Sequence, residues 1–151
     1  MIRDDIKAAL VTAMKARDAG RTAALRLIQA AIKNRDIEMR TAAAPAEDDA
    51  LIIEVLQKMA KQRRESIEMF EAGGRAELAA AERAELAVIE SFLPAQLDET
   101  AARAVISSIV AELGASSVKD MGRVMAAVKE RHSGEIDMAR ASGLVKAALT
   151  A

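Results

Sequence analysis

Basic side chains at regular helical spacing are the feature of this 151-residue sequence best suited to chemistry. Arg26, Lys33 and Arg40 follow one another at intervals of seven residues, which aligns them on one face of an α-helix. Lys61 and Arg64 share one face of a later helical segment. Arg and Lys neutralise phosphate groups and release counterions, so both groups are suited to contact a nucleic-acid backbone. The alternative interpretation is that each is an ordinary solvated helix face.

Two further arginines interrupt the apolar stripes of the sequence. Arg35 falls within the apolar face of one predicted helix, and Arg63 falls within that of the next. A buried guanidinium without a partner is strongly unfavourable. Glu82 and Glu85 lie on the apolar side of an acidic helical segment and are candidate partners. We therefore expect structural ion pairs, with ligand contacts as the alternative.

The sequence contains no recognisable set of catalytic residues. Cys is absent, which excludes thiolate nucleophiles and Cys-ligated metals, and a single His, His132, builds no zinc site of the usual kind. Ser116 and Lys119 have the Ser-x-x-Lys spacing of some acyl-transfer enzymes. A helix start with a capping box at Ser117 explains that segment better. We predict no catalytic residue, no metal and no cofactor.

The elements that position these side chains are all expected to be helices. Ala is abundant, β-branched residues are sparse, and apolar residues recur at intervals of three and four. Gly20 is predicted to end the first helix, Asp48 or Asp49 to cap the third, and Gly114 to close the fifth. The expected helices span about residues 2–18, 22–40, 50–72 and 75–93, followed by three shorter helices that begin after Asp98, Ser117 and Asp137.

Pro94 is the strongest boundary signal in the chain. It predicts an N-terminal helical domain with a helical linker over residues 1–93, and a C-terminal three-helix domain over residues 94–151. Gly122 and Gly143 lie inside predicted helices of the second domain, where Gly is unfavourable. We expect them to mark close helix packing, or alternatively contact of the backbone with a ligand.

Composition excludes several classes of function. Two Phe and no Tyr or Trp leave no aromatic platform for stacking unpaired bases. The net charge of −1 gives no global basic field, so nucleic-acid binding needs a local patch. No run approaches the ~20 apolar residues of a membrane span, so no membrane partner is expected. The first residues lack the apolar stretch of a secretory signal, from which we expect a cytoplasmic location.

Several blocks of the sequence together resemble the GatB/YqeY family. The blocks are residues 25–28, 31–34, 62–66, 92–94 and 117–125, with Gly134, Asp137 and residues 144–146. The resemblance covers nearly the whole chain and implies two small three-helix domains joined by a long, partly helical linker. Relatives usually have a glycine and a lysine after the aspartate of the last block. This chain has Met138, Ala139 and Arg140 there, so Arg140 is the candidate substitute for a basic contact.

The resemblance also implies a function. The C-terminal part is similar to the tail of the GatB subunit of tRNA-dependent amidotransferase, a carbon–nitrogen ligase that uses glutamine. In that enzyme the tail contacts tRNA, and the chemistry lies elsewhere. The resemblance therefore implies a tRNA-associated helical module.

The expected function is a non-catalytic module that binds tRNA or a tRNA-handling protein complex of the amidotransferase type. The residues expected to contact phosphate are Lys119, Arg123, Lys146, Arg26, Lys33, Lys61 and Arg64. One alternative is a protein–protein adaptor whose Met-rich and Ala-rich faces dock a partner helix. Another is a true amidotransferase component, which requires ligase or glutaminase activity from the purified chain.

Overall fold

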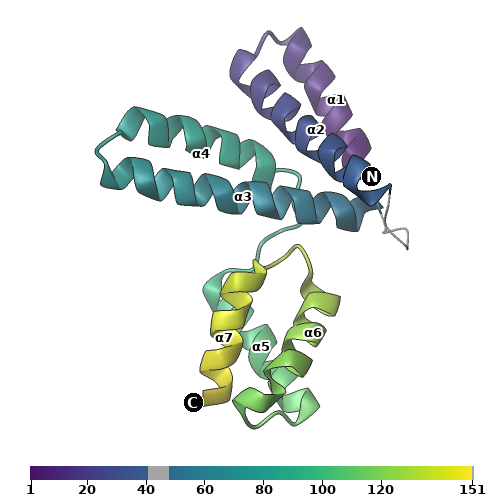
Figure 1. The fold of residues 1–151 in the computed structure, drawn as a ribbon, viewed down its shortest axis with the longest axis vertical. Coiled ribbons are helices and arrows are strands. Elements are labelled where there is room, and N and C mark those ends of the chain that lie inside the picture. Colours follow the sequence, from purple (N-terminus) through teal and green to yellow (C-terminus); the bar gives the residue numbers. More distant parts are fainter. Residues whose placement is uncertain (41–47, 151) are drawn as a thin grey trace. The chain divides into compact units, whose positions relative to one another are not determined.

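The structure, a computed structural model, describes residues 1–40 and 48–150. Within those residues it contains seven α-helices, one short 3-10 helix and no β-strand, which confirms the all-helical prediction (Figure 1). The helices are α1 (Ile2–Lys15), α2 (Ala19–Met39), α3 (Asp48–Ala72), α4 (Ala76–Glu90), α5 (Glu99–Leu113), η1 (Val118–Asp120), α6 (Met121–His132) and α7 (Met138–Thr150).

The chain divides into two compact units, which we name the first unit (Met1–Leu93) and the second unit (Pro94–Ala151). The second unit opens at Pro94, whose ring and missing N–H do not suit the interior of a helix. Each unit has its own cluster of buried apolar side chains. That each unit folds as a separate domain, and that a linker joins them, stays a prediction.

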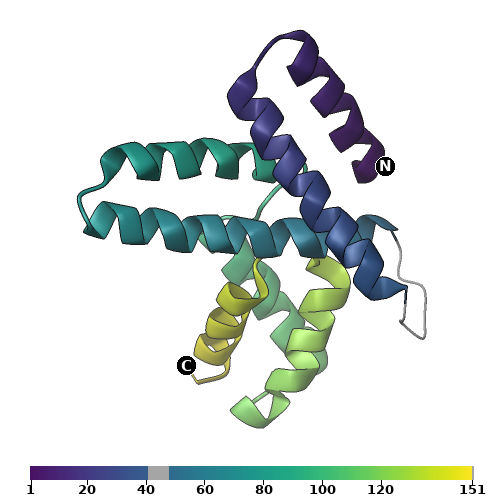
Figure 2. The ribbon, with the colours of Figure 1, turned by 45° about the horizontal axis from the view of Figure 1, so that its top comes forward.

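Two helical hairpins make up the first unit. α1 packs against α2, α3 packs against α4, and α2 also contacts both α3 and α4 (Figure 2). Their apolar faces meet in one core, in which Leu25, Ile28, Ile52, Leu56 and Ile89 are almost completely excluded from solvent. Burial of such side chains is the main favourable contribution to the stability of a fold of this size.

Three helices, α5, α6 and α7, pack pairwise against one another in the second unit. Local signals set the ends of α5 as the sequence predicts. The Asp98 carboxylate accepts a hydrogen bond from the backbone N–H of Ala101 at 2.7 Å, and Gly114 closes the helix with φ 62°. Among the described residues no single helix is long and apolar enough to cross a membrane. Residues 99–113 and 118–132 pass that test only as a pair, bent by 96°.

The junction between α1 and α2 differs from the prediction. Gly20 does not end α1; the helix ends at Lys15, and Arg17 adopts the left-handed turn conformation with φ 55°. Asp18 then caps α2, because its carboxylate accepts a hydrogen bond from the backbone N–H of Arg21 at 3.0 Å. Gly20 therefore lies inside the first turn of α2.

The two aspartates at the start of α3 bind residues of α1 and do not act as N-caps. Asp48 and Asp49 lie inside the first turn of α3, so the prediction of either as its N-cap is wrong. Asp49 accepts a hydrogen bond from the backbone N–H of Ile2 at 3.1 Å, and Asp48 accepts bonds from the guanidinium of Arg3. The sequence between the expected helices, residues 41–49 with Pro45, predicts a loop, but Asp48 and Asp49 already belong to α3, and residues 41–47 lie outside the described residues.

Arg3 of α1 ties three helices of the first unit together. Its guanidinium donates to Asp36 of α2 at 2.9 and 3.0 Å and to Asp48 of α3 at 2.7 Å. These hydrogen bonds lower the pKa of both carboxyls below the ordinary value of 3.8. The side chains of Asp36 and Asp48 are 37% and 41% exposed, so water screens the attraction considerably.

The first prediction concerns the pH dependence of this contact. Arg3→Met is expected to lower the free energy of unfolding by about 1 kcal/mol at pH 7. A carboxyl whose pKa is lowered by folding stabilises the fold above its unfolded pKa, and that stability is lost as the pH falls through the folded pKa. Urea unfolding at a series of pH values should therefore show the difference between wild type and variant shrinking below about pH 4. A difference that is equally large at pH 7 and at pH 3 would contradict this role of Arg3.

Candidate nucleic-acid interface

One end of the second unit carries three of the seven residues predicted to contact phosphate. Lys119 lies in η1, Arg123 in the first turn of α6, and Lys146 in the later part of α7. All three are exposed, and η1 packs against both α6 and α7. In Figure 1, α6 begins and α7 ends at the same end of this unit. We call this surface, made of Lys119, Arg123 and Lys146, the η1 patch.

The three cations of the η1 patch differ in how free they are to bind a phosphate group. Asp120 accepts hydrogen bonds from the backbone N–H groups of Ser116 at 3.0 Å and of Ser117 at 3.4 Å, which lower its pKa. It thereby forms the capping box that the sequence predicts at Ser117. The same carboxylate accepts a hydrogen bond from Arg123 at 3.2 Å. Lys119 and Lys146 form no ion pair with any described residue, so they are the better candidates for phosphate contact.

Gly122 and Gly143 lie close in sequence to these cations, in α6 and α7. The prediction that they mark close helix packing is wrong, because a Cβ built on either residue meets no neighbouring group within 4 Å. A helical Gly is less favourable than Ala by about 1 kcal/mol, and packing does not offset that cost at these two positions. The alternative, contact of the exposed backbone with a ligand, stays a prediction.

The other four predicted residues do not meet in one place. Arg26 and Lys33 are exposed on α2, where they line two different hollows. Lys61 is exposed on α3 and forms no ion pair within the described residues. Arg64 donates to Glu90 of α4 at 2.9 Å, so part of its charge is already neutralised.

A second group of cations, not predicted from the sequence as a group, lies at the turn between α1 and α2. Lys15, Arg17 and Arg21 lie there together with Arg26, and Asp18 is the only acidic residue from position 15 to 26. Counting charge in a short window would have found this group. A search for seven-residue spacing separates Arg26 from its neighbours and so passes over it.

Both arginines of the apolar stripes are ion-paired. The Nε atom of Arg63 lies 2.7 Å from a carboxylate oxygen of Glu85 and 3.4 Å from one of Glu82, the partners predicted from the sequence. Neither contact has the alignment of a hydrogen bond, and the Nε atom is buried. Arg35 pairs instead with Glu38 and Glu54, at 3.1 and 3.2 Å.

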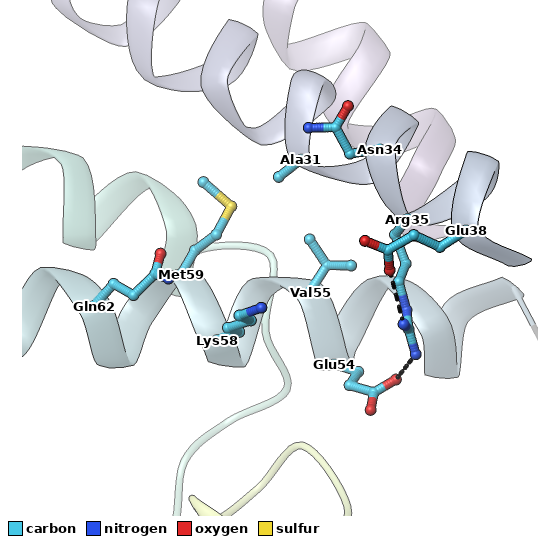
Figure 3. A pocket seen from close by; sticks show the side chains of 9 residues that line it. All are labelled: Ala31, Asn34, Arg35, Glu38, Glu54, Val55, Lys58, Met59 and Gln62. Carbon is cyan, nitrogen blue, oxygen red and sulfur yellow. Dashed lines mark hydrogen bonds and ion pairs between the residues drawn. The ribbon is translucent and has the colours of Figure 1, made fainter.

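A hollow of about 500 Å³ lies between α2 and α3 (Figure 3). Ala31, Val55 and Met59 contribute apolar surface, while Asn34, Lys58 and Gln62 contribute polar groups. Arg35 lies at one side and is held by its two glutamates. The lining contains no Ser, Thr, Cys or His that could act as a nucleophile or transfer a proton near neutral pH. Across the part of the chain that the structure describes, no group of three or more His, Cys, Asp or Glu is arranged to hold a metal ion.

Comparison with known proteins relates nearly the whole chain to one family. A family model described as Yqey-like protein matches residues 3–149. Altered inheritance of mitochondria protein 41, mitochondrial, of Eremothecium gossypii is 35% identical over 103 residues, which are 66% of this chain and 55% of the relative. Proteins of the same name from two strains of Saccharomyces cerevisiae are 30% identical over 93 residues, which are 62% of this chain and 46% of the relative. The chain thus spans about half the length of the curated relatives that it matches.

These relatives correct the location expected from the sequence. All three are named as mitochondrial proteins, which contradicts the expectation of a cytoplasmic location. That expectation depended on the lack of a secretory signal. Mitochondrial targeting uses amphipathic, Arg-rich segments and not an apolar stretch, so the lack of a secretory signal says nothing about it.

Proposed function

The chain belongs to the YqeY-like protein family, and from this we propose that it is a non-catalytic helical module that binds tRNA, alone or within a complex of the tRNA-dependent amidotransferase type. Its residues hold the phosphate backbone and position the RNA, and any bond-making chemistry belongs to a partner protein. Phosphate contacts of this kind fix register and orientation but do not read the base sequence.

The observation that carries the proposal is the pair of exposed lysines in the η1 patch. Lys119 and Lys146 come from segments that pack against each other, and neither forms an ion pair with a described residue. Two ammonium groups on one surface can contact neighbouring phosphates of one strand without first breaking an internal ion pair. The open space above Gly122 and Gly143 gives a phosphate or ribose room to approach the helix backbone.

A protein–protein adaptor is the second candidate function, and the exposed apolar side chains of the first unit favour it. Met69 is 75% exposed, and Leu27 and Ile37 are each nearly half exposed. Together with the hollow between α2 and α3, they offer apolar surface to a partner helix. The adaptor would bind its partner with little dependence on salt, whereas binding of RNA through phosphate contacts weakens steeply with salt.

The test is a fluorescence anisotropy titration of end-labelled, unfractionated tRNA with the purified intact chain. We expect saturable binding at about 20 mM salt, where screening is weak. The same preparation is expected to show no glutamine hydrolysis and no ligase activity. Absence of tRNA binding at this salt concentration, together with capture of protein partners that survive nuclease treatment, would favour the adaptor and reject the proposal.

A further inference from the structure

We infer that the turn between α1 and α2 is a second phosphate-binding site, which holds the phosphodiester backbone of the RNA through Arg17 and Arg26. The inference rests on the proposed function and adds to it a defined contact in the first unit. We call this site, made of Lys15, Arg17, Arg21 and Arg26, the α1–α2 turn site.

A hollow of about 370 Å³ gives the site its shape. Arg17, Thr22 and Arg26 contribute its polar groups, Met14 contributes apolar surface, and the small side chains of Ala19 and Ala23 leave it open. Arg17 follows the end of α1, and Arg26 lies about two turns into α2. A phosphate in the hollow therefore meets two guanidinium groups, which bind phosphate oxygens bidentately, and a hydroxyl donor.

The charge around the hollow favours an anion. Lys15, Arg17, Arg21 and Arg26 form no ion pair with any described residue. The one acidic residue of the segment, Asp18, is occupied as the N-cap of α2 by the backbone N–H of Arg21. By comparison, Arg63, Arg64 and Arg123 are all engaged with carboxylates. The turn is thus a concentration of cations with no internal partner.

The backbone conformation of Arg17 is a second observation that supports a role of its side chain in binding phosphate. The N–H of Asp18 donates to the carbonyl of Ala13 and the N–H of Arg17 to that of Met14, which is the hydrogen-bond pattern of a Schellman turn. Glycine is the usual residue at the left-handed position of this turn, because a Cβ is disfavoured there. Arg17 occupies it with φ 55°. With Arg in place of Gly, the backbone conformation at this position is less favourable, but a guanidinium group lies at the hollow.

The surroundings favour RNA over an anionic membrane surface. A helix that lies in a membrane interface buries a broad apolar face, usually with Trp, Phe or Leu. Here the exposed large apolar residues near the turn are Val11, Met14 and Leu27 among the described residues, with no aromatic side chain, which is a small apolar surface for such a helix. An open hollow with two guanidinium groups at its wall suits a phosphate group that projects from a strand.

The experiment measures tRNA affinity and its salt dependence for two double variants of the intact chain. Arg17→Gly with Arg26→Gln removes two cations from the α1–α2 turn site. Lys58→Gln with Arg75→Gln removes two exposed cations that also form no ion pair with any described residue, one in α3 and one just before α4, and serves as the matched control. We expect the first variant to bind tRNA about tenfold more weakly than the control at low salt and to reduce the salt slope by about two units. Its melting temperature should not fall below that of wild type, because Gly suits the backbone at position 17.

The outcomes separate this inference from the proposed function. If the intact chain does not bind tRNA, the proposed function fails and the inference fails with it. If the intact chain binds tRNA and the Arg17→Gly, Arg26→Gln variant binds as well as the control, the inference alone is wrong. It is also wrong if that variant keeps its tRNA affinity but loses binding to vesicles that contain phosphatidylserine.

Discussion

Replacing Lys119 and Lys146 together by Glu is expected to weaken tRNA binding about 100-fold at low salt. Both side chains are exposed on segments that pack against each other, so the two reversals place two repulsive charges on one surface. The second unit should keep its fold, because neither side chain is buried or forms an ion pair with a described residue. Fluorescence anisotropy with labelled tRNA measures the affinity, and far-ultraviolet circular dichroism checks the helix content.

Arg103→Glu with Lys129→Glu is the matched control for this prediction. It makes the same change in net charge within the second unit, but it alters exposed residues near the start of α5 and near the end of α6. Of these, Arg103 pairs with Glu99, and Lys129 forms no ion pair with any described residue. The control is expected to lose only the affinity that follows from net charge, about threefold to fivefold. Equal losses for the two variants would show that the η1 patch has no special part in binding.

The second large effect is expected at Arg63, on the stability of the first unit. Arg63→Leu should lower the free energy of unfolding by about 2 kcal/mol, because it leaves Glu82 and Glu85 facing each other without a cation. The side chain of Arg63 is only 20% exposed, and those of the two glutamates are 23% and 34% exposed. Their mutual repulsion is therefore screened less than it would be at the surface. Urea unfolding measures the change.

Two further variants decide whether Arg63 is structural. Arg64→Leu, at the next position, removes a more exposed arginine paired with Glu90 and should cost less than about 0.5 kcal/mol. Combining Arg63→Leu with Glu82→Gln and Glu85→Gln should restore most of the lost stability, because no uncompensated charge remains. A ligand-binding role for Arg63 would be indicated instead if Arg63→Leu left stability unchanged and weakened tRNA binding.

Features set by neighbouring residues could be predicted from the sequence. The Asp98 cap, the Gly114 helix end and the Ser117 capping box each depend on residues within five positions of one another. The ion pairs of Arg63 join residues that are further apart in the sequence. They could still be predicted, because helical periodicity places Arg63 and its two glutamates on the apolar faces of α3 and α4. All-helical structure followed from the same periodicity.

Features that depend on tertiary contacts could not be predicted in this way. Arg3 meets Asp36 and Asp48, which are 33 and 45 positions away, and no local pattern indicates that α1 brings them together. The partners of Arg35 turned out to be Glu38 and Glu54 because α2 lies beside α3. Gly122 and Gly143 were misread for the same reason, since whether a neighbouring group lies against a glycine depends on how the helices pack.

The candidate site was predictable in part. Helical periodicity identified the exposed cations, but it did not show which of them pair with carboxylates. Arg64 and Arg123 are engaged with Glu90 and Asp120, whereas Lys119 and Lys146 remain without such partners among the described residues. Arg17 lies outside the seven-residue spacing that identified Arg26, although the local excess of basic residues is visible in the sequence; its left-handed conformation is visible only once the backbone is known.

Binding of tRNA through phosphate contacts is tested most directly by the slope of log Kobs against log salt concentration for the intact chain and tRNA. Each cation that meets a phosphate contributes somewhat less than one unit of negative slope. We expect a slope between about −3 and −5, from the cations of the η1 patch and of the α1–α2 turn site. A slope near zero, with binding still present, would contradict this expectation, because recognition would then not depend on phosphate contacts.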